Sequence, residues 1–212
     1  LSPLSAIEHS PEVARQAPAL TQIMPRLSNV RVRNVATVGG AFAHGDPHMD
    51  LPPTAMALGG RVRIVGTGGE RELAIEDLLT GYYETALKAK ELIASLIIPA
   101  QATARTIYLK VTAGAADDWP ALGVAVCLEA AGGNIKSARV VVSAATPKAA
   151  RLTSVEKLLA GATADAKTLQ AAGDAAVAEA DIIGDVRGSA AYKRELLRVT
   201  IGRAVRAAMG GK

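Results

Sequence analysis

The sequence predicts an α+β protein in which helices and antiparallel strands occur in separate groups. Short apolar runs of strand length, bounded by glycine and proline, occupy much of the chain between residues 61 and 145. Residues 152–209 instead carry apolar residues at the three- and four-residue spacing of helices. Half of all residues are hydrophobic, which is enough for a core without disulfides or metals.

The first 60 residues are expected to form short helices. Ser10-Pro11-Glu12 combines an N-cap, a first-turn proline and a first-turn acid. Pro18 begins a second helix, which Pro25 ends early or kinks. After the basic segment 31–33 we expect a glycine turn at residues 37–41, and then a short helix that Gly59-Gly60 stops.

Residues 61–99 predict a small sheet. RVRIVG and RELAI flank Gly66–Gly69, which is typical of a tight hairpin. A short helix follows from Ile75 to Leu79, and the strand ELIASLIIP ends at Pro99. We place a boundary at residues 99–103, between a domain of residues 1–100 and a domain of residues 104–209.

The second domain is expected to be a three-stranded antiparallel sheet with three helices. The strands are RTIYLKVT (105–112), ALGVAVCLEA (121–130) and NIKSARVVVSAA (134–145), joined by short links. The helices are predicted at 154–161, at 165–180 and from the N-cap Ser189 onward. In the last helix, Leu197, Ile201, Ala204, Val205 and Ala208 share one face, and Lys193, Arg194, Arg198 and Arg206 are placed outward.

Composition excludes several functions. The net charge is only +4, the basic residues are scattered and aromatics make up 3%, so nucleic acid binding is not expected. A single cysteine, Cys127, excludes an internal disulfide and cannot hold an iron–sulfur cluster by itself; we expect it buried in a reducing compartment. No window approaches the ~18 apolar residues of a membrane span, and we expect a cytoplasmic protein.

Most of the possible chemistry lies in residues 34–53, NVATVGGAFAHGDPHMDLPP. His44, Asp46, His48 and Asp50 occupy every second position, so on a strand they would face one side and could bind Zn, Mn or Fe. A metal-dependent hydrolase is therefore one candidate. Pro47 opposes it, because proline in the middle of the run makes a regular strand unfavourable.

An anion cradle is the second candidate in this stretch. Backbone N–H groups of residues 37–41 and the Thr37 hydroxyl could wrap a phosphate, with Arg31 or Arg33 screening its charge. Asp50 would then be free to accept hydrogen bonds from a ribose or a ring N–H. A plain glycine turn explains the same residues equally well.

A resemblance favours the cradle. The run VRNVATVGGAFAHGDPHMDLP closely resembles the second flavin-binding segment of the FAD-carrying medium subunit of molybdenum hydroxylases, the xanthine dehydrogenase and carbon monoxide dehydrogenase family. The family pattern is roughly R-N-x-x-T-(I/V)-G-G-(N/S)-x-x-H-x-D-P-x-x-D-L-P. The likeness continues through ELIASLIIP, YLKVTAG and DVRGSAAYKRELLRV, in the same order and over almost the whole chain.

The resemblance implies roles for particular residues. The FAD pyrophosphate would lie against Thr37, Val38, Gly39, Gly40 and Ala41. Asp50 would hydrogen-bond the adenosine or flavin end of FAD, while Leu27 and Ile93 would pack against the cofactor. Lys110 would lie near the isoalloxazine and stabilise negative charge on the reduced ring. His44 and Asp46 would shape the loop.

The sequence departs from the family in three places. Ala41 stands where the family often has Asn or Ser, and Thr112, Ala113 and Gly114 replace Arg-rich positions. The family's first flavin loop normally precedes everything in this chain, and nothing before Asn34 resembles it. We therefore expect residues 1–100 to be the later part of an FAD-binding domain of the vanillyl-alcohol-oxidase (PCMH) type, whose N-terminal part is absent from this sequence and which would not retain tight FAD alone.

The resemblance also implies an activity and partners. The chain would be the FAD subunit of an oxidoreductase, receiving electrons from iron–sulfur clusters on a small subunit and passing them to an external acceptor. Those clusters would be fed by a molybdopterin large subunit, as a heterotrimer that pairs into a dimer. A flavin-free scaffold subunit remains a third candidate beside the FAD subunit and the metal-dependent hydrolase.

Overall fold

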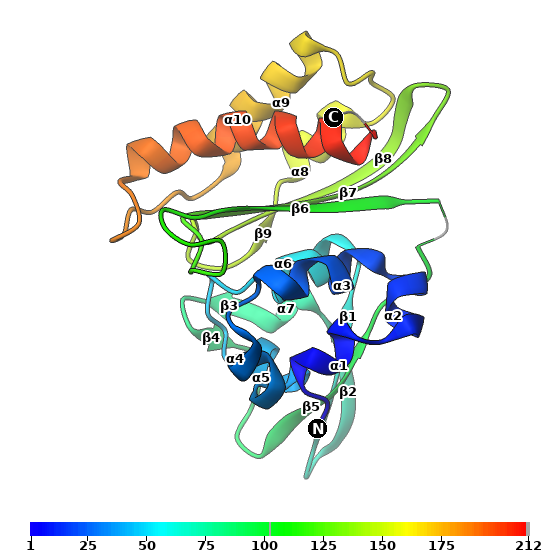
Figure 1. The fold of residues 1–212 in the computed structure, drawn as a ribbon, viewed down its shortest axis with the longest axis vertical. Coiled ribbons are helices and arrows are strands. Elements are labelled where there is room, and N and C mark those ends of the chain that lie inside the picture. Colours follow the sequence, from blue (N-terminus) through cyan, green and yellow to red (C-terminus); the bar gives the residue numbers. More distant parts are fainter. Residues whose placement is uncertain (102, 211–212) are drawn as a thin grey trace.

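The computed structural model describes residues 1–101 and 103–210 and has two halves (Figure 1). Among the described residues, the N-terminal half holds seven short α-helices, one 3-10 helix and two small sheets, and the C-terminal half holds a larger sheet with three helices. Both halves thus mix helices with antiparallel strands, as predicted.

Short helices, three of them with side-chain N-caps, form most of the first 60 residues. They are α1 (Leu4–Glu8), α2 (Pro11–Gln16), α3 (Pro18–Ile23), the 3-10 helix η1 (Met24–Arg26), α4 (Val30–Val35), α5 (Val38–Ala43) and α6 (Leu51–Ala57). The Ser10 side chain caps α2, and α3 gives way to η1 just before Pro25, as the prolines predict. The predicted turn at residues 37–41 is wrong, because Thr37 caps a helix that begins at Val38.

Two small antiparallel sheets complete the N-terminal half. The hairpin of β1 (Arg61–Gly66) and β2 (Gly69–Ala74) is confirmed, and β5 (Glu91–Ile97) pairs with the other edge of β1. Helix α7 (Ile75–Leu78) leads into β3 (Leu79–Gly81), which pairs with β4 (Glu84–Thr85). This half packs around its own apolar core, which includes Phe42, Leu51 and Ile64.

The larger sheet is an antiparallel meander in the order β6-β7-β8-β9. Its strands are β6 (Arg105–Val111), β7 (Leu122–Ala131), β8 (Asn134–Ser143) and β9 (Ala150–Arg151). The expectation of three strands is corrected by β9, a two-residue strand on the outer edge of β8. Gly132 and Gly133 have φ of +60° and +83°, the left-handed conformation that this hairpin turn requires.

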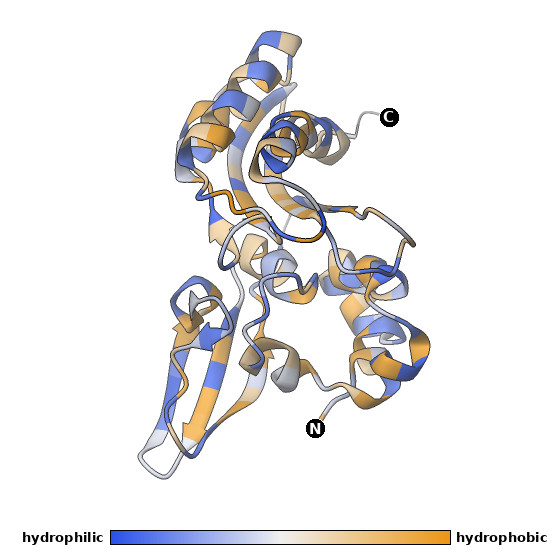
Figure 2. Ribbon diagram, turned by 90° about the vertical axis from the view of Figure 1, so that its left-hand side faces the viewer, coloured by the Kyte–Doolittle hydropathy of each residue, from blue (hydrophilic) through white to orange (hydrophobic). Residues whose placement is uncertain are grey.

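Helices α8 (Thr153–Leu159), α9 (Ala166–Glu179) and α10 (Ala190–Ala208) cover one face of this sheet, and the N-terminal half covers the other (Figures 1 and 2). Successive side chains of β7 point to opposite faces of the sheet, so the strand contributes to two hydrophobic cores. Val124 and Val126 point into the core beneath the helices, whereas Ala125 and Cys127 join the core of the N-terminal half. Cys127 is buried, as predicted.

The last helix corrects one prediction. Ser189 caps α10, and its apolar face is buried as expected. Lys193, which the helical pattern places outward, is instead fully buried. Its ammonium lies 2.9 Å from an Asp185 oxygen and donates to the carbonyl of Ala144 at 3.0 Å. A buried lysine is compatible with folding because these groups pair with it.

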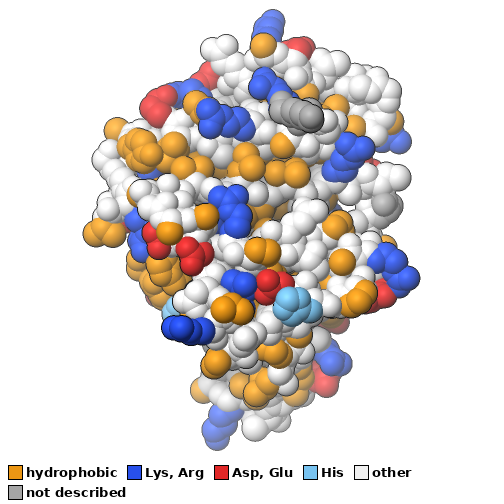
Figure 3. Space-filling model, viewed as in Figure 1, with side chains coloured by type: hydrophobic (Ala, Val, Ile, Leu, Met, Phe, Trp, Pro, Cys, Tyr) orange, Lys and Arg blue, Asp and Glu red, His pale blue; other side chains and the backbone are white. Residues whose placement is uncertain are grey.

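In the part of the chain that the structure describes, none of the helices combines the length and the apolar character needed to cross a bilayer. Lys and Arg side chains among the described residues are spread singly over the face in Figure 3, without a continuous basic surface.

The packing of α9 against α10 makes a testable prediction about two glycines. A Cβ on Gly173 would overlap the backbone carbonyl of Arg198, whereas one on Gly202 would lie 3.5 Å from Leu169 Cβ, an ordinary contact. Gly173→Ala should therefore lower the free energy of unfolding by about 1–3 kcal/mol. Gly202→Ala, the matched control, should raise it by up to about 1 kcal/mol. Urea unfolding measures both, and equal stability of the two variants would contradict the close helix contact.

Candidate functional site

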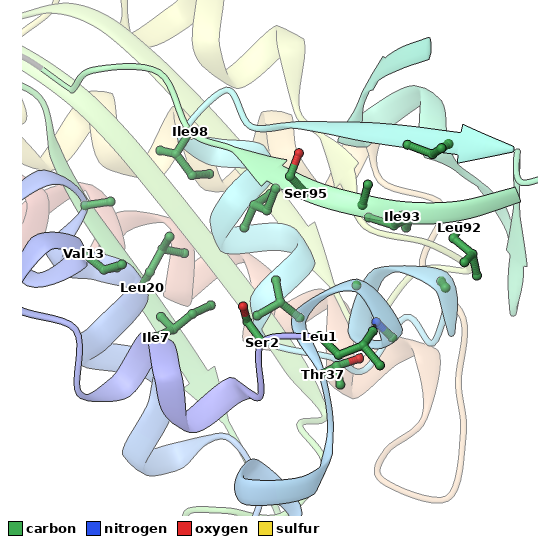
Figure 4. A pocket seen from close by; sticks show the side chains of 18 of the residues that line it. Leu1, Ser2, Ile7, Val13, Leu20, Thr37, Leu92, Ile93, Ser95 and Ile98 are labelled. Atoms are coloured by element: carbon green, nitrogen blue, oxygen red, sulfur yellow. Dashed lines mark hydrogen bonds between the residues drawn. The ribbon is translucent and has the colours of Figure 1, made fainter. Parts of the chain in front are cut away.

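A large cavity of about 1170 Å³ opens between the N-terminal helices and β5 (Figure 4). Ile7, Val13 and Leu20 line its helical wall, and residues 91–96 of β5, with Ile98 just after that strand, line the opposite wall. Residues 37–40 at the start of α5 complete the lining. The surface is mostly apolar, with few polar groups, which is typical of a small-molecule site.

Gly39 lets α5 approach β5 closely at this cavity. A Cβ at this position would lie 2.8 Å from the carbonyl oxygen of Ile93, so no side chain fits there without movement. The hydrogen bonds of the backbone amides around Gly39 differ from those of the predicted phosphate cradle. The amides of Val38, Gly40 and Ala41 donate to Ser2 O, Thr37 Oγ1 and Thr37 O. Among the described residues the Gly39 N–H has no such partner, so it remains available to a ligand.

A second, smaller cavity of about 240 Å³ contains a buried ion pair. Lys110 Nζ lies 2.8 Å from Asp50 Oδ2, and the two side chains are 3% and 5% exposed. The Tyr108 hydroxyl donates to Asp50 Oδ1 at 2.7 Å, and Lys110 also donates to Arg26 O at 2.7 Å. The sequence suggested that Asp50 would be free to bind a ligand. Its carboxylate is instead bound by Tyr108 and Lys110. Lys110 retains one N–H for another acceptor.

The electrostatics of this pair follow from its burial. Removal from water raises the pKa of the Asp50 carboxyl, and Lys110 and Tyr108 oppose that rise. Burial also raises the pKa of the Tyr108 hydroxyl well above its usual value, with the neighbouring Asp50 adding to the effect. Tyr108 therefore stays a hydrogen-bond donor across the ordinary pH range. The sequence analysis gave Tyr108 no role, although this residue begins the family-like run YLKVTAG that contains Lys110.

The residues predicted to bind cofactor divide into three groups. Thr37, Val38, Gly39, Gly40 and Ile93 line the large cavity. Asp50 and Lys110 line the small one. Leu27 and Ala41 are buried in the core of the N-terminal half and line neither.

The four alternating polar residues do not form a metal site. Residues 44–50 form a loop between α5 and α6 rather than a strand. His48 Nδ1 lies 2.9 Å from Asp46 Oδ1, while Asp50 is bound to Lys110. Among the described residues no group of three or more His, Cys, Asp or Glu side chains is placed to hold a metal ion.

Arg33 does not face the predicted anion site. It lies in α4 and is buried, with Nε 2.8 Å from Glu8 Oε2 and Nη1 donating to Ser28 O at 2.8 Å. The expectation that Arg33 screens a phosphate is therefore wrong, because its guanidinium ties α4 to α1. Arg31 is exposed on α4.

Comparison with known proteins identifies one family on each half of the chain. The family described as "FAD binding domain in molybdopterin dehydrogenase" matches residues 1–101. The family described as "CO dehydrogenase flavoprotein C-terminal domain" matches residues 107–208.

Curated relatives and solved structures agree with these matches. The nicotine 6-hydroxylase medium subunit of Paenarthrobacter nicotinovorans is 31% identical over 201 residues, covering 95% of this chain and 70% of that protein. The carbon monoxide dehydrogenase medium chain of Hydrogenophaga pseudoflava is 29% identical over 199 residues, covering 94% of this chain and 69% of that one. A structure of carbon monoxide dehydrogenase from Hydrogenophaga pseudoflava, lacking the Mo-pyranopterin moiety, matches with a TM-score of 0.94 and 30% identity, over 99% of this chain and 73% of that chain.

The Asp50–Lys110 pair generates a stability prediction. Lys110→Met keeps most of the length of the side chain but leaves the Asp50 carboxylate buried without its bonded cation. The free energy of unfolding should fall by about 3–5 kcal/mol at neutral pH. Loss of the cation raises the pKa of Asp50 in the folded state further, so a proton relieves the cost in acid. The deficit should thus be smallest below about pH 4 and should grow as the pH rises.

Urea unfolding at several pH values measures this deficit. Lys136→Met, which removes an exposed lysine of β8, is the matched control and should change stability by no more than about 0.5 kcal/mol. A Lys110→Met deficit that does not vary with pH would contradict the ion pair.

Proposed function

Because the chain belongs to the family of FAD-binding medium subunits of molybdenum hydroxylases, we propose that it holds FAD and passes electrons from a partner subunit to an external acceptor. The family and the PCMH-type fold predicted from the sequence are confirmed. The proposal is carried by the cavity in which the Thr37–Gly40 backbone and Ile93 meet.

The residues of this cavity fit the adenosine diphosphate part of FAD. The free N–H of Gly39, at a position with no room for a Cβ, suits a phosphate oxygen that approaches the backbone. The apolar side chains of Ile93 and its neighbours suit the faces of an adenine ring. Thr37 holds the amide of Gly40 and so keeps the start of α5 in place. These are binding and orienting roles, not chemical ones.

Asp50 and Lys110 fit the flavin end. Bound FAD supplies a carrier that accepts and releases electrons. Lys110 contributes a buried positive charge, which favours added negative charge nearby and so raises the reduction potential of a neighbouring flavin. Asp50 and the carbonyl of Arg26 orient the Lys110 ammonium, leaving its third N–H for the cofactor. We propose that Leu27 acts from the core as packing beneath this region rather than by direct contact.

The proposed partners are an iron–sulfur small subunit and a molybdopterin large subunit, assembled as a dimer of heterotrimers in the cytoplasm. Relatives carry the words "medium subunit" and "medium chain" in their names, which implies subunits of other sizes in their complexes. The buried Cys127 supports a division of labour, because one cysteine cannot supply a cluster. The metal-dependent hydrolase is disfavoured, since Asp46, His48 and Asp50 are engaged by protein groups.

A spectrum of the purified native complex tests the proposal. We expect flavin absorbance that survives treatment with a metal chelator and that bleaches when substrate is added to the complete complex. A chelator-sensitive hydrolase activity without flavin would support the metal site instead. Absence of flavin from an intact complex would support the scaffold subunit.

The Gly39 cavity supplies a second prediction. Gly39→Ala pushes a methyl group against the carbonyl of Ile93 and should weaken FAD binding by about tenfold or more, a loss of ~1.4 kcal/mol, so that less FAD is retained by the purified complex. Gly68→Ala, in the β1–β2 turn with open space around it, should retain the wild-type occupancy. FAD per subunit, measured by absorbance after purification, compares the two. Equal FAD content in the two variants would show that residues 37–40 do not contact FAD.

A further inference from the structure

Arg26 is an exposed arginine that lines the smaller cavity, the one that contains Asp50 and Lys110. It is the last residue of η1, and its main chain is fixed on both sides. Met24 and Leu27 are buried, and Lys110 Nζ donates to the Arg26 carbonyl at 2.7 Å. Among the described residues, the guanidinium of Arg26 forms no ion pair. Arg26 therefore carries a positive charge that is anchored at the cavity but has no counter-charge.

The charged side chains of this cavity do not cancel one another. Asp50 and Lys110 lie 2.8 Å apart, so the ionised pair carries no net charge. Arg26 adds a second positive group, and two positive groups with one negative group sum to +1. Burial raises the pKa of the Asp50 carboxyl and of the Tyr108 hydroxyl, and the charge of Arg26 is among the effects that oppose this rise. A ligand in this cavity thus meets a net positive charge.

The polar groups that remain open in the cavity are mainly hydrogen-bond donors. The Asp50 carboxylate already accepts from Tyr108 and Lys110, and the Arg26 carbonyl accepts from Lys110. The third N–H of Lys110 and the guanidinium of Arg26 can only donate. Gln22, on the preceding helix, lines the same cavity and can donate as well. The cavity therefore favours a ligand edge that accepts hydrogen bonds and carries negative charge.

The rest of the lining is apolar. It consists of Ala19 and Ile23 of α3, Ile107 and Leu109 of β6, and Ala207 of α10. A free phosphate ion needs polar groups on all sides, and these walls would leave much of its surface unpaired. The volume of about 240 Å³ is also below the ~300–1,000 Å³ of a complete small-molecule site. One charged edge of a larger flat ring fits both properties.

We propose that Arg26 supplies the uncompensated positive charge that binds the N1–C2=O edge of the flavin ring, and binds it more strongly when the ring is reduced. Reduction places negative charge on this edge, whose two heteroatoms accept hydrogen bonds. Arg26 thereby raises the reduction potential of bound FAD. The inference rests on the proposed function, and it assigns the net charge to a residue outside the buried network of Asp50, Tyr108 and Lys110.

A purely structural role of Arg26 makes a different prediction. An arginine in the last turn of a helix can simply stabilise the helix end. Such a role affects stability and leaves the flavin potential unchanged. Substitution of Lys110 does not separate the two roles, because Lys110 belongs to the buried network and changes position and charge together. Substitution of Arg26 does separate them, since its side chain is exposed.

Redox titration of the purified native complex measures the potential. Arg26→Gln removes the charge and keeps a polar side chain. It should weaken binding of reduced FAD relative to oxidised FAD about tenfold, which lowers the potential by about 30 mV for the two-electron couple. Arg26→Lys keeps the charge and should restore most of the potential. Arg194→Gln removes an exposed arginine of α10 outside the cavity lining, and this matched control should keep the wild-type potential.

Two further measurements distinguish charge from structure. The FAD content of the oxidised complexes should be nearly the same in all variants, because the oxidised ring carries no net charge at this edge. Salt screens an exposed charge, so the wild-type potential should fall toward that of Arg26→Gln between about 0.05 M and about 1 M salt. The potential of Arg26→Gln should change clearly less over the same range.

Several outcomes would overturn the inference. One is a wild-type potential in Arg26→Gln with FAD retained. A low potential in Arg26→Lys would indicate that shape rather than charge matters, and an equal shift in Arg194→Gln would indicate a general surface effect. Loss of oxidised FAD from Arg26→Gln would contradict the preference for the reduced ring. Absence of flavin from the wild-type complex would instead overturn the proposed function, so the two failures are distinguishable.

Discussion

Burial of both faces of the four-stranded sheet constrains most of this structure, because each face must be covered by a different part of the chain. Helices α8, α9 and α10 cover one face, and the N-terminal half, through α6 in particular, covers the other. A central strand such as β7 can therefore be apolar at consecutive positions, with Val124 and Val126 on one side and Ala125 and Cys127 on the other. The four-stranded sheet therefore lies between the three C-terminal helices and the N-terminal half. Residues of β6 contact the loop before α6.

Charged groups lie at the interface between the two halves of the chain. Asp50 meets Lys110, and His48 meets Asp185, so the end of the loop before α6 is bound by the other half at two points. Removing such groups from water is costly, and a buried ion pair often contributes little net stability. What it does provide is a single allowed arrangement, because any displacement leaves a charge without a partner. These pairs join elements that come from distant parts of the sequence.

The cavity beside α5 depends on a different property, the absence of a side chain at Gly39. The helix start and β5 approach each other so closely that the Ile93 carbonyl occupies the space of a Cβ. Among the described residues, the Gly39 N–H has no protein acceptor. Apolar walls and one short polar stretch of backbone thus result from the packing of two elements. This pattern accommodates a ligand that is apolar at one end and anionic at the other.

Local signals in the sequence determined most of the elements, through the Ser10 and Ser189 caps and the hairpins at Gly66–Gly69 and Gly132–Gly133. The motif at residues 34–53 indicated the family but not the helix that begins at Val38. Such local signals succeed because a cap, a turn or a motif involves neighbouring residues. Tertiary structure alone decided which charges are buried. Lys193 lies at an outward position of the helical pattern, yet Asp185 and Ala144 surround it, and His48 finds a carboxylate 137 residues away. Such pairings depend on how the two halves meet at the sheet, and no periodicity within a segment records that.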